Sequence, residues 1–181
     1  MAGTIYTIGH SNHPEERFFG LLEAHAIRTL ADVRAIPGSR RHPHFGRDAL
    51  TASCRRHGMT YRWMPGLGGR RRAPKDRSSP HVAWEVAAFR AYADYMETPE
   101  FAAALAELER EAAAPTAFCC AEALWWQCHR RLIADRLTVQ GWTVLHIDSG
   151  GHTRQHALPD FARVEGGRLV YDVGVTLDLP T

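Results

Sequence analysis

Apolar positions along this chain alternate between short β-type runs and stretches with helical spacing. Residues 4–8 form a β-rich run that ends at a glycine, and residues 29–33 form a second one. Between them, Pro14 and two acidic residues suit the start of a helix, which Phe18 and Leu21 continue at helical spacing. A strand, a helix and a strand within about thirty residues form a βαβ unit, which predicts parallel pairing.

The pattern repeats towards the end of the chain. It predicts further strands at residues 59–64, 116–120 and 142–147, and helices at residues 48–57, 81–96, 99–113 and 128–141. Residues 161–175 predict a β-hairpin that turns at Gly166 and Gly167. The whole chain, residues 1–181, is therefore expected to be a single α/β domain: a mostly parallel sheet of about five strands flanked by helices, with a C-terminal β-hairpin.

Length and composition agree with a globular domain. A chain of 181 residues with 45% apolar residues can bury a hydrophobic core that is stable without disulfides or bound metal ions. The N-terminus lacks a basic region followed by a long apolar stretch, and no run approaches the ~18 apolar residues of a membrane span. The four cysteines lack the spacing of a disulfide framework and are expected as reduced thiols. We therefore expect a cytoplasmic protein without a membrane partner.

Charge is unevenly distributed, although the net charge is only +2. Residues 28–77 hold 13 basic and 3 acidic residues, whereas the rest of the chain holds 9 basic and 17 acidic residues. Such segregation favours a positive face that binds a polyanion. The plainer alternative is a solvated basic face, because arginine-rich composition alone supplies many of these residues.

Candidate binding residues fall in the loops after the strands, because open parallel sheets bind ligands beyond the carboxyl ends of their strands. These loops are residues 9–13, 34–47, 65–72 and 121–127. Their predicted substrate-binding or nucleic-acid-binding residues are His10, Ser11, Asn12, Arg34, Ser39, Arg40, Arg41, Gly68, Gly69, Arg70 and Arg71.

Residues 119–132, CCAEALWWQCHRRL, join the end of a strand to the start of a helix. At a helix start, free backbone N–H groups and the helix dipole favour negative charge. The Cys-His-Arg-Arg run at residues 128–131 therefore suits that position only if an anion, or a carboxylate such as Glu122, lies among the cations. A surface ion pair of Arg130 is the alternative.

Cys128 has two interpretations at this helix start. Beside His129 its thiolate is favoured, as in reactive cysteines, but a single cysteine is equally often a small buried apolar residue. A zinc site made by Cys120, Cys128 and His129 is the weaker alternative, and neither a metal nor a cofactor is expected. Trp125 and Trp126 are adjacent, so one suits the core and the other a platform on which a base stacks.

Asp32 and Arg34 lie two residues apart near a strand end and share one face of the sheet. An arginine beside Asp32 keeps this carboxylate charged, and a charged carboxylate in a basic cleft can activate water. The alternative is a structural ion pair that holds the following loop.

Several short motifs stand in a fixed order: YTIGHSN at residues 6–12, DVR and P-x-SR within residues 32–40, LGG at 67–69, CAE at 120–122 and CHR at 128–130. Together they resemble the bacterial and archaeal proteins catalogued as domain of unknown function 488. The resemblance covers residues 4–148 and leaves residues 149–181 as a C-terminal extension. The tryptophan pair before the CHR motif departs from the family pattern.

The resemblance implies that ten residues converge on one site: Asp32, Arg34, Ser39, Arg40, Gly68, Gly69, Glu122, Cys128, His129 and Arg130. It also implies an activity in nucleic-acid enzymology, including removal of modified bases from DNA.

Three functions are then expected as hypotheses. The first is a DNA glycosylase-like hydrolase that grips phosphates with its basic residues, stacks an extruded base on a tryptophan, and uses Asp32 or Glu122 as the catalytic carboxylate. The second is a cysteine-dependent enzyme that acts on a small phosphate or sulfur substrate through Cys128. The third is a non-catalytic nucleic-acid-binding module, which needs the arginines but neither carboxylate.

Overall fold

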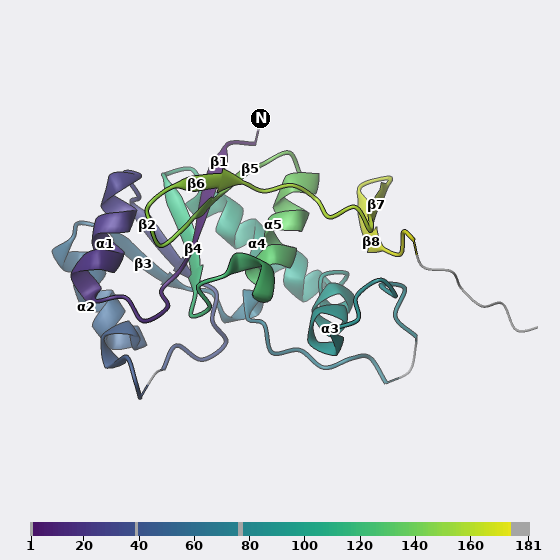
Figure 1. The fold of residues 1–181 in the computed structure, drawn as a ribbon, viewed down its shortest axis with the longest axis horizontal. Helices are drawn as coiled ribbons and strands as arrows, with labels where there is room; N and C mark the ends of the chain where they lie inside the picture. Colours follow the sequence, from purple (N-terminus) through teal and green to yellow (C-terminus); the bar gives the residue numbers. More distant parts are fainter. Residues whose placement is uncertain (1, 39, 76–77, 175–181) are drawn as a thin grey trace, which may run out of the picture.

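The computed structural model describes residues 2–38, 40–75 and 78–174. Its main sheet has six strands in the order β3-β2-β4-β1-β5-β6 (Figure 1). The strands are β1 (Thr4–Gly9), β2 (Thr29–Asp32), β3 (Thr60–Trp63), β4 (Thr116–Cys120), β5 (Thr143–Ile147) and β6 (Thr153–Gln155). The first five pair in parallel and β6 is antiparallel to β5, so the α/β class with a mostly parallel sheet is confirmed.

The register of the parallel strands brings their carboxyl ends to one level. Gly9 pairs with Cys120, and Asp32 pairs with both Cys119 and Trp63. The loops that follow β1, β2, β3 and β4 therefore begin along the same edge of the sheet. This alignment positions the candidate site.

Helices cover both faces of the sheet (Figure 1). The helices are α1 (Glu15–Ala24), α2 (Arg47–Arg56), α3 (Ala87–Tyr95), α4 (Pro99–Glu111) and α5 (Arg130–Val139). Residues of α1 and α2 join one buried cluster with Ile8, and residues of α3, α4 and α5 join another with Ile5. Because side chains alternate along β1, one strand feeds both cores. Within the described ranges, no helix is long and apolar enough to cross a membrane.

The C-terminal hairpin is confirmed as β7 (Ala162–Glu165) and β8 (Arg168–Tyr171), which form a separate two-stranded sheet. Gly166 and Gly167 have φ values of 56° and 79°, the conformation that a tight hairpin turn requires. Tyr171 of β8 is fully buried and packs edge-on against Trp84. The hairpin therefore contributes to the core on the α3–α5 side.

Three details of the sequence prediction are wrong. The sheet has six strands rather than about five, because the short exposed strand β6 was not predicted. The helix expected at residues 81–96 begins only at Ala87, because Val86 is still in an extended conformation. Helix α5 begins at Arg130, because Cys128 is still in an extended conformation.

Candidate functional site

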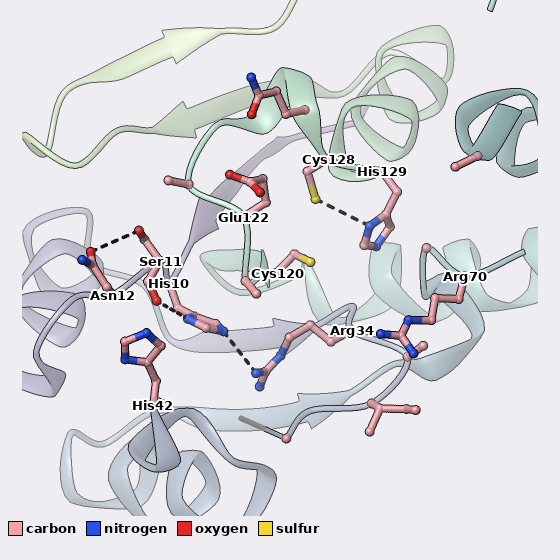
Figure 2. A pocket seen from close by; sticks show the side chains of 18 of the residues that line it. His10, Ser11, Asn12, Arg34, His42, Arg70, Cys120, Glu122, Cys128 and His129 are labelled. Carbon is pink, nitrogen blue, oxygen red and sulfur yellow. Dashed lines mark hydrogen bonds between the residues drawn. The ribbon is translucent and has the colours of Figure 1, made fainter. Parts of the chain in front are cut away.

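A cavity of about 700 Å³ opens at the carboxyl edge of the parallel strands (Figure 2). The loops after β1, β2 and β4, the segment after the one-turn helix Pro65–Leu67, and the start of α3 form its wall. Nine of the residues predicted from the sequence line it: His10, Ser11, Asn12, Arg34, Gly69, Arg70, Glu122, Cys128 and His129.

Glu122 is positioned by a close crossing of two chain segments. His10 and Ser11 donate their main-chain N–H groups to the carbonyls of Cys120 and Ala121, both at 2.9 Å. A Cβ atom on Gly9 would lie 1.9 Å from the Glu122 carbonyl oxygen, so only glycine permits this crossing. The Glu122 residue is exposed and borders the cavity.

Asp32 lies beneath the cavity rather than in its wall. It is fully buried, and its Oδ1 accepts hydrogen bonds from Arg34 Nε (2.8 Å) and the Arg34 main-chain N–H (3.1 Å). Its Oδ2 accepts from Arg34 Nη2 and from the Tyr61 hydroxyl (2.7 Å). With both oxygens occupied inside the protein, the geometry favours the structural interpretation of Asp32, which is to hold Arg34 and the loop after β2.

Arg34 links the buried Asp32 to His10 in the cavity wall. Its Nη1 donates to His10 Nε2 at 3.2 Å, and His10 Nδ1 donates to the Ser11 carbonyl at 2.9 Å. Burial lowers the pKa of His10 to about 4, and the ring stacks on Phe45. His10 is therefore a neutral imidazole of fixed orientation at neutral pH.

Cys120, Cys128 and His129 form a sulfur–imidazole cluster in the opposite wall. Cys128 Sγ lies 3.5 Å from His129 Nδ1, and His129 Nε2 lies 3.1 Å from the Val33 carbonyl oxygen. Because a carbonyl can only accept, Nε2 carries the proton and the lone pair of Nδ1 faces the thiol. A Cβ atom on Gly69 would lie 2.5 Å from Nδ1, so a glycine there makes room for the ring.

The environment of this cluster favours negative charge on Cys128. A hydrogen bond from the Cys120 thiol lowers the pKa of Cys128 well below its usual value, and the nearby Arg130 guanidinium acts in the same direction. The same sulfur contact, together with burial, raises the pKa of Cys120. Cys128 is thus polarised towards the thiolate, whereas Cys120 stays protonated in the absence of a ligand.

Arg130 lies buried behind the cluster. In the described part of the chain, its guanidinium contacts only a hydroxyl and main-chain carbonyls: Thr7 Oγ1 at 2.7 Å, Glu122 O at 2.6 Å and Ala123 O at 3.4 Å. A buried cation without a carboxylate partner is costly. Arg130 in turn favours negative charge on Cys128, since it is one of the groups that lower the pKa of that thiol.

Comparison with known protein families identifies one family that matches the chain. The family model described as domain of unknown function DUF488 matches residues 15–137, more than half of the chain. The chain belongs to this family. The resemblance predicted from the sequence motifs is thereby confirmed for the segment from Asp32 to Arg130. No curated protein and no solved structure matched the chain.

Several predicted site residues of this DUF488 chain lie outside the cavity wall. Gly68 packs against Ala35, where a Cβ atom would meet the Ala35 Cβ at 2.8 Å. Arg71 stacks over the Tyr95 ring, 3.7 Å from its centroid, and donates to the carbonyls of Pro65, Gly66 and Gly68. Both residues shape the loop that carries Gly69 and Arg70.

The two tryptophans have different environments, and Trp125 is half-buried rather than part of the core. The Trp125 ring stacks on His146, with centroids 4.1 Å apart and planes at 6°, whereas Trp126 is 44% exposed. Neither lines the cavity, and the Trp126 ring makes an edge contact with Trp125. Arg40 and Arg41 are exposed beyond the cavity wall, and Ser39 lies outside the described residues.

Other residues that line the cavity were not predicted as ligands. They include His42, Phe89 and Gln127. His42 lies in the predicted basic loop and Gln127 precedes Cys128, so both were within reach of sequence reasoning. Phe89 enters from α3, which no local pattern connects to the strand ends.

Proposed function

We propose that this DUF488 protein is a hydrolase that acts on nucleic acid, with the cavity as its active site and Glu122 as its catalytic carboxylate. Removal of a modified base from DNA is the most concrete form of this proposal. The proposal rests on one observation: among the described residues of the cavity wall, Glu122 is the only carboxylate. It faces a wall that includes His10, Arg34 and Arg70.

Size and charge support a nucleotide as the ligand. A volume of about 700 Å³ is suited to one extruded base and its sugar. Exposed arginines continue from the cavity rim on both sides: Arg40 and Arg41 after β2, and Arg70 and Arg72 after the helix Pro65–Leu67. Such side chains can hold phosphates on either side of an extruded nucleotide.

The carboxylate can contribute in two ways. A sugar that loses its base passes through a cationic transition state, which a nearby carboxylate stabilises. Glu122 can also act as a general base that orients and deprotonates water. Both roles need a charged, accessible carboxylate, and Asp32 is buried and already occupied by Arg34 and Tyr61.

The test is incubation with oligonucleotides that carry a panel of modified bases, with abasic-site formation as the readout. Glu122→Gln should lower the rate by roughly 100-fold or more with DNA affinity unchanged or improved. Glu107→Gln on α4 changes an exposed glutamate away from the cavity and serves as the matched control. Full turnover by Glu122→Gln would place the chemistry elsewhere.

Binding is tested separately from chemistry. Affinity for duplex DNA should fall steeply with salt, and the double variant Arg70→Ala/Arg72→Ala should flatten that dependence. Arg71 is left unchanged because it is held by Tyr95 and three carbonyls. Absence of DNA binding at low salt would exclude the nucleic-acid proposal.

A second candidate function is favoured by the pair of Cys128 and His129. The imidazole lone pair faces the thiol, and the Val33 carbonyl orients the ring, as in enzymes with a cysteine nucleophile and a histidine base. Such an enzyme would act on a small phosphate or sulfur compound. Cys128→Ser and thiol alkylation should then abolish turnover, whereas the carboxylate mechanism retains activity within about tenfold in Cys128→Ser.

A further inference from the structure

Three soft donor atoms meet at one point of the cavity wall. Cys120 Sγ, Cys128 Sγ and His129 Nδ1 all lie within 4.8 Å of one another. Figure 2 shows the two sulfurs and the imidazole ring turned towards a common centre. They come from the end of β4 and the residues just before α5, two elements whose relative position is fixed by the sheet and its core.

The spacing of the donors suits a tetrahedral metal ion. Zinc lies about 2.3 Å from a cysteine sulfur and about 2.05 Å from a histidine nitrogen, so two such ligands stand about 3.5 Å apart in a tetrahedron. Cys128 Sγ and His129 Nδ1 are 3.5 Å apart. Cys120 Sγ lies within 4.8 Å of both atoms, and two cysteine sulfurs on a tetrahedral zinc ion stand about 3.8 Å apart.

The surroundings of His129 match those of a metal ligand. Histidines that bind metals donate their second ring N–H to a carbonyl or a carboxylate, which fixes the tautomer. His129 Nε2 makes this contact with the Val33 carbonyl, and the lone pair of Nδ1 is thereby directed at the sulfurs. Gly69 leaves the space that the ring occupies.

Charge also balances at this point. Two thiolates and one divalent ion are neutral together, and an anionic fourth ligand would be offset by Arg130, whose contacts in the described chain are a hydroxyl and carbonyls. Thiolate and imidazole donors select zinc over magnesium or calcium, which prefer oxygen.

We propose that Cys120, Cys128 and His129 form a Zn²⁺ site whose fourth coordination position faces the cavity. Three protein ligands and one open position are typical of zinc sites at which a substrate or water binds. The proposal concerns metal binding, which is measured without a substrate, so it stands or fails independently of the proposed function.

The test uses the full chain, reduced and freed of metal. Co²⁺ titration should give the intense near-ultraviolet absorption of thiolate-to-cobalt charge transfer together with the visible bands of a tetrahedral ion. Zn²⁺ should displace Co²⁺ with one equivalent, and a chromophoric chelator gives the Zn²⁺ affinity. Cobalt spectra without a thiolate band would mean that the metal binds other histidines, and this would overturn the proposal.

Variants assign the ligands. Loss of a supporting contact around a metal ligand costs about 10–100-fold in affinity, so Cys120→Ser and Cys128→Ser should each lose on the order of 100-fold or more. Cys119→Ala is the matched control, because its sulfur belongs to the core on the opposite side of β4. Its affinity should stay within about threefold, and equal Zn²⁺ affinity in all three variants would contradict the assignment.

A measurement on the unmutated protein covers the case in which a variant fails to fold. Zn²⁺ should protect Cys120 and Cys128 from alkylation and leave the reactivity of Cys54 and Cys119 unchanged, as mapped by mass spectrometry. Unprotected Cys128 at saturating Zn²⁺ would overturn the proposal. A Cys128 that binds zinc cannot also be a free nucleophile, so the same experiment separates this site from the cysteine-dependent candidate.

Discussion

Two buried carboxylates, Asp32 at the cavity and Asp135 on α5, have nearly the same set of partners. Each is fully buried and accepts a hydrogen bond from a tyrosine hydroxyl at 2.7 Å, from Tyr61 and Tyr171 respectively. Each also accepts from a basic side chain: Arg34 in the first case and His156, at 2.7 Å, in the second. The two networks differ in the kind of base: an arginine holds Asp32, whereas the histidine that holds Asp135 is itself hydrogen-bonded to a second histidine, His146.

Arg34 is charged at every accessible pH, so the Asp32 network is a permanent ion pair. In the Asp135 network, His156 donates its Nε2 proton to Asp135 and its Nδ1 then accepts from His146 Nε2 at 2.9 Å. This leaves His146 Nδ1 as a buried acceptor that has no partner among the residues that the structure describes. A permanently charged arginine therefore holds the carboxylate at the cavity, whereas a chain of two histidines holds the carboxylate at the junction with the C-terminal extension.

The largest expected effect is removal of the charge on Asp32. Asp32→Asn leaves a buried guanidinium without a counter-charge, which should cost about 3–5 kcal/mol of unfolding free energy. Asp135→Asn leaves histidines that can stay neutral, so its cost should be about 1–3 kcal/mol. Chemical denaturation of both variants measures the difference. Equal losses would show that Asp135 and His156 also form a charged pair.

The sequence predicts most of the strands that position the Asp32 and Asp135 networks. Strands β1 to β5 are short β-rich runs, and their parallel order follows from the helices between them. Strand β6 could not be predicted, because Thr153, Arg154 and Gln155 are all exposed and their strand exists only through pairing with β5. The Asp135 network depends on that pairing, since His156 follows β6 directly.

The same distinction holds at the candidate site. Parallel register explains why the loops with His10, Arg34, Glu122 and Cys128 meet, and the sequence motifs predict it. Contacts with residues far along the chain decide which side chains of a loop turn inward, and the sequence does not show these contacts. Arg71 was therefore predicted as a ligand, although it stacks on Tyr95, 24 residues further along the chain.

An intermediate effect is expected from removing each tyrosine hydroxyl. The oxygen of Asp135 that accepts from Tyr171 has no second donor within the described residues, whereas the corresponding oxygen of Asp32 also accepts from Arg34. Tyr171→Phe should therefore cost about 1.5–3 kcal/mol and Tyr61→Phe about 1 kcal/mol, both as unfolding free energies from denaturant titration. The reverse order would mean that Tyr61 stabilises Asp32 more than Tyr171 stabilises Asp135, contrary to the number of donors at each oxygen.

A third expected effect is the dependence of stability on pH, which accumulates over several pH units and tests whether the histidines of the Asp135 network are neutral in the native protein. Burial, with a smaller contribution from the nearby Arg130 guanidinium, lowers the pKa of His146 to about 2. An unfolded histidine has a pKa of about 6.5, so below this pH the unfolded chain binds a proton that native His146 does not. Native stability should therefore fall as pH decreases from about 6.5, by at most about 1.4 kcal/mol per pH unit for this group.

His10 provides the internal reference for this measurement. Its pKa is lowered to about 4, so it contributes the same sign of pH dependence, but only between about pH 6.5 and pH 4. Unfolding free energies at several pH values between 6.5 and 3.5 should show a continuous loss in the unmutated protein. His146→Gln should flatten the curve over the whole interval, and His10→Gln only above about pH 4. A His146→Gln protein that loses stability with acid as steeply as the parent would mean that His146 is protonated in the native state, and the Asp135 network would then be a charged one like that of Asp32.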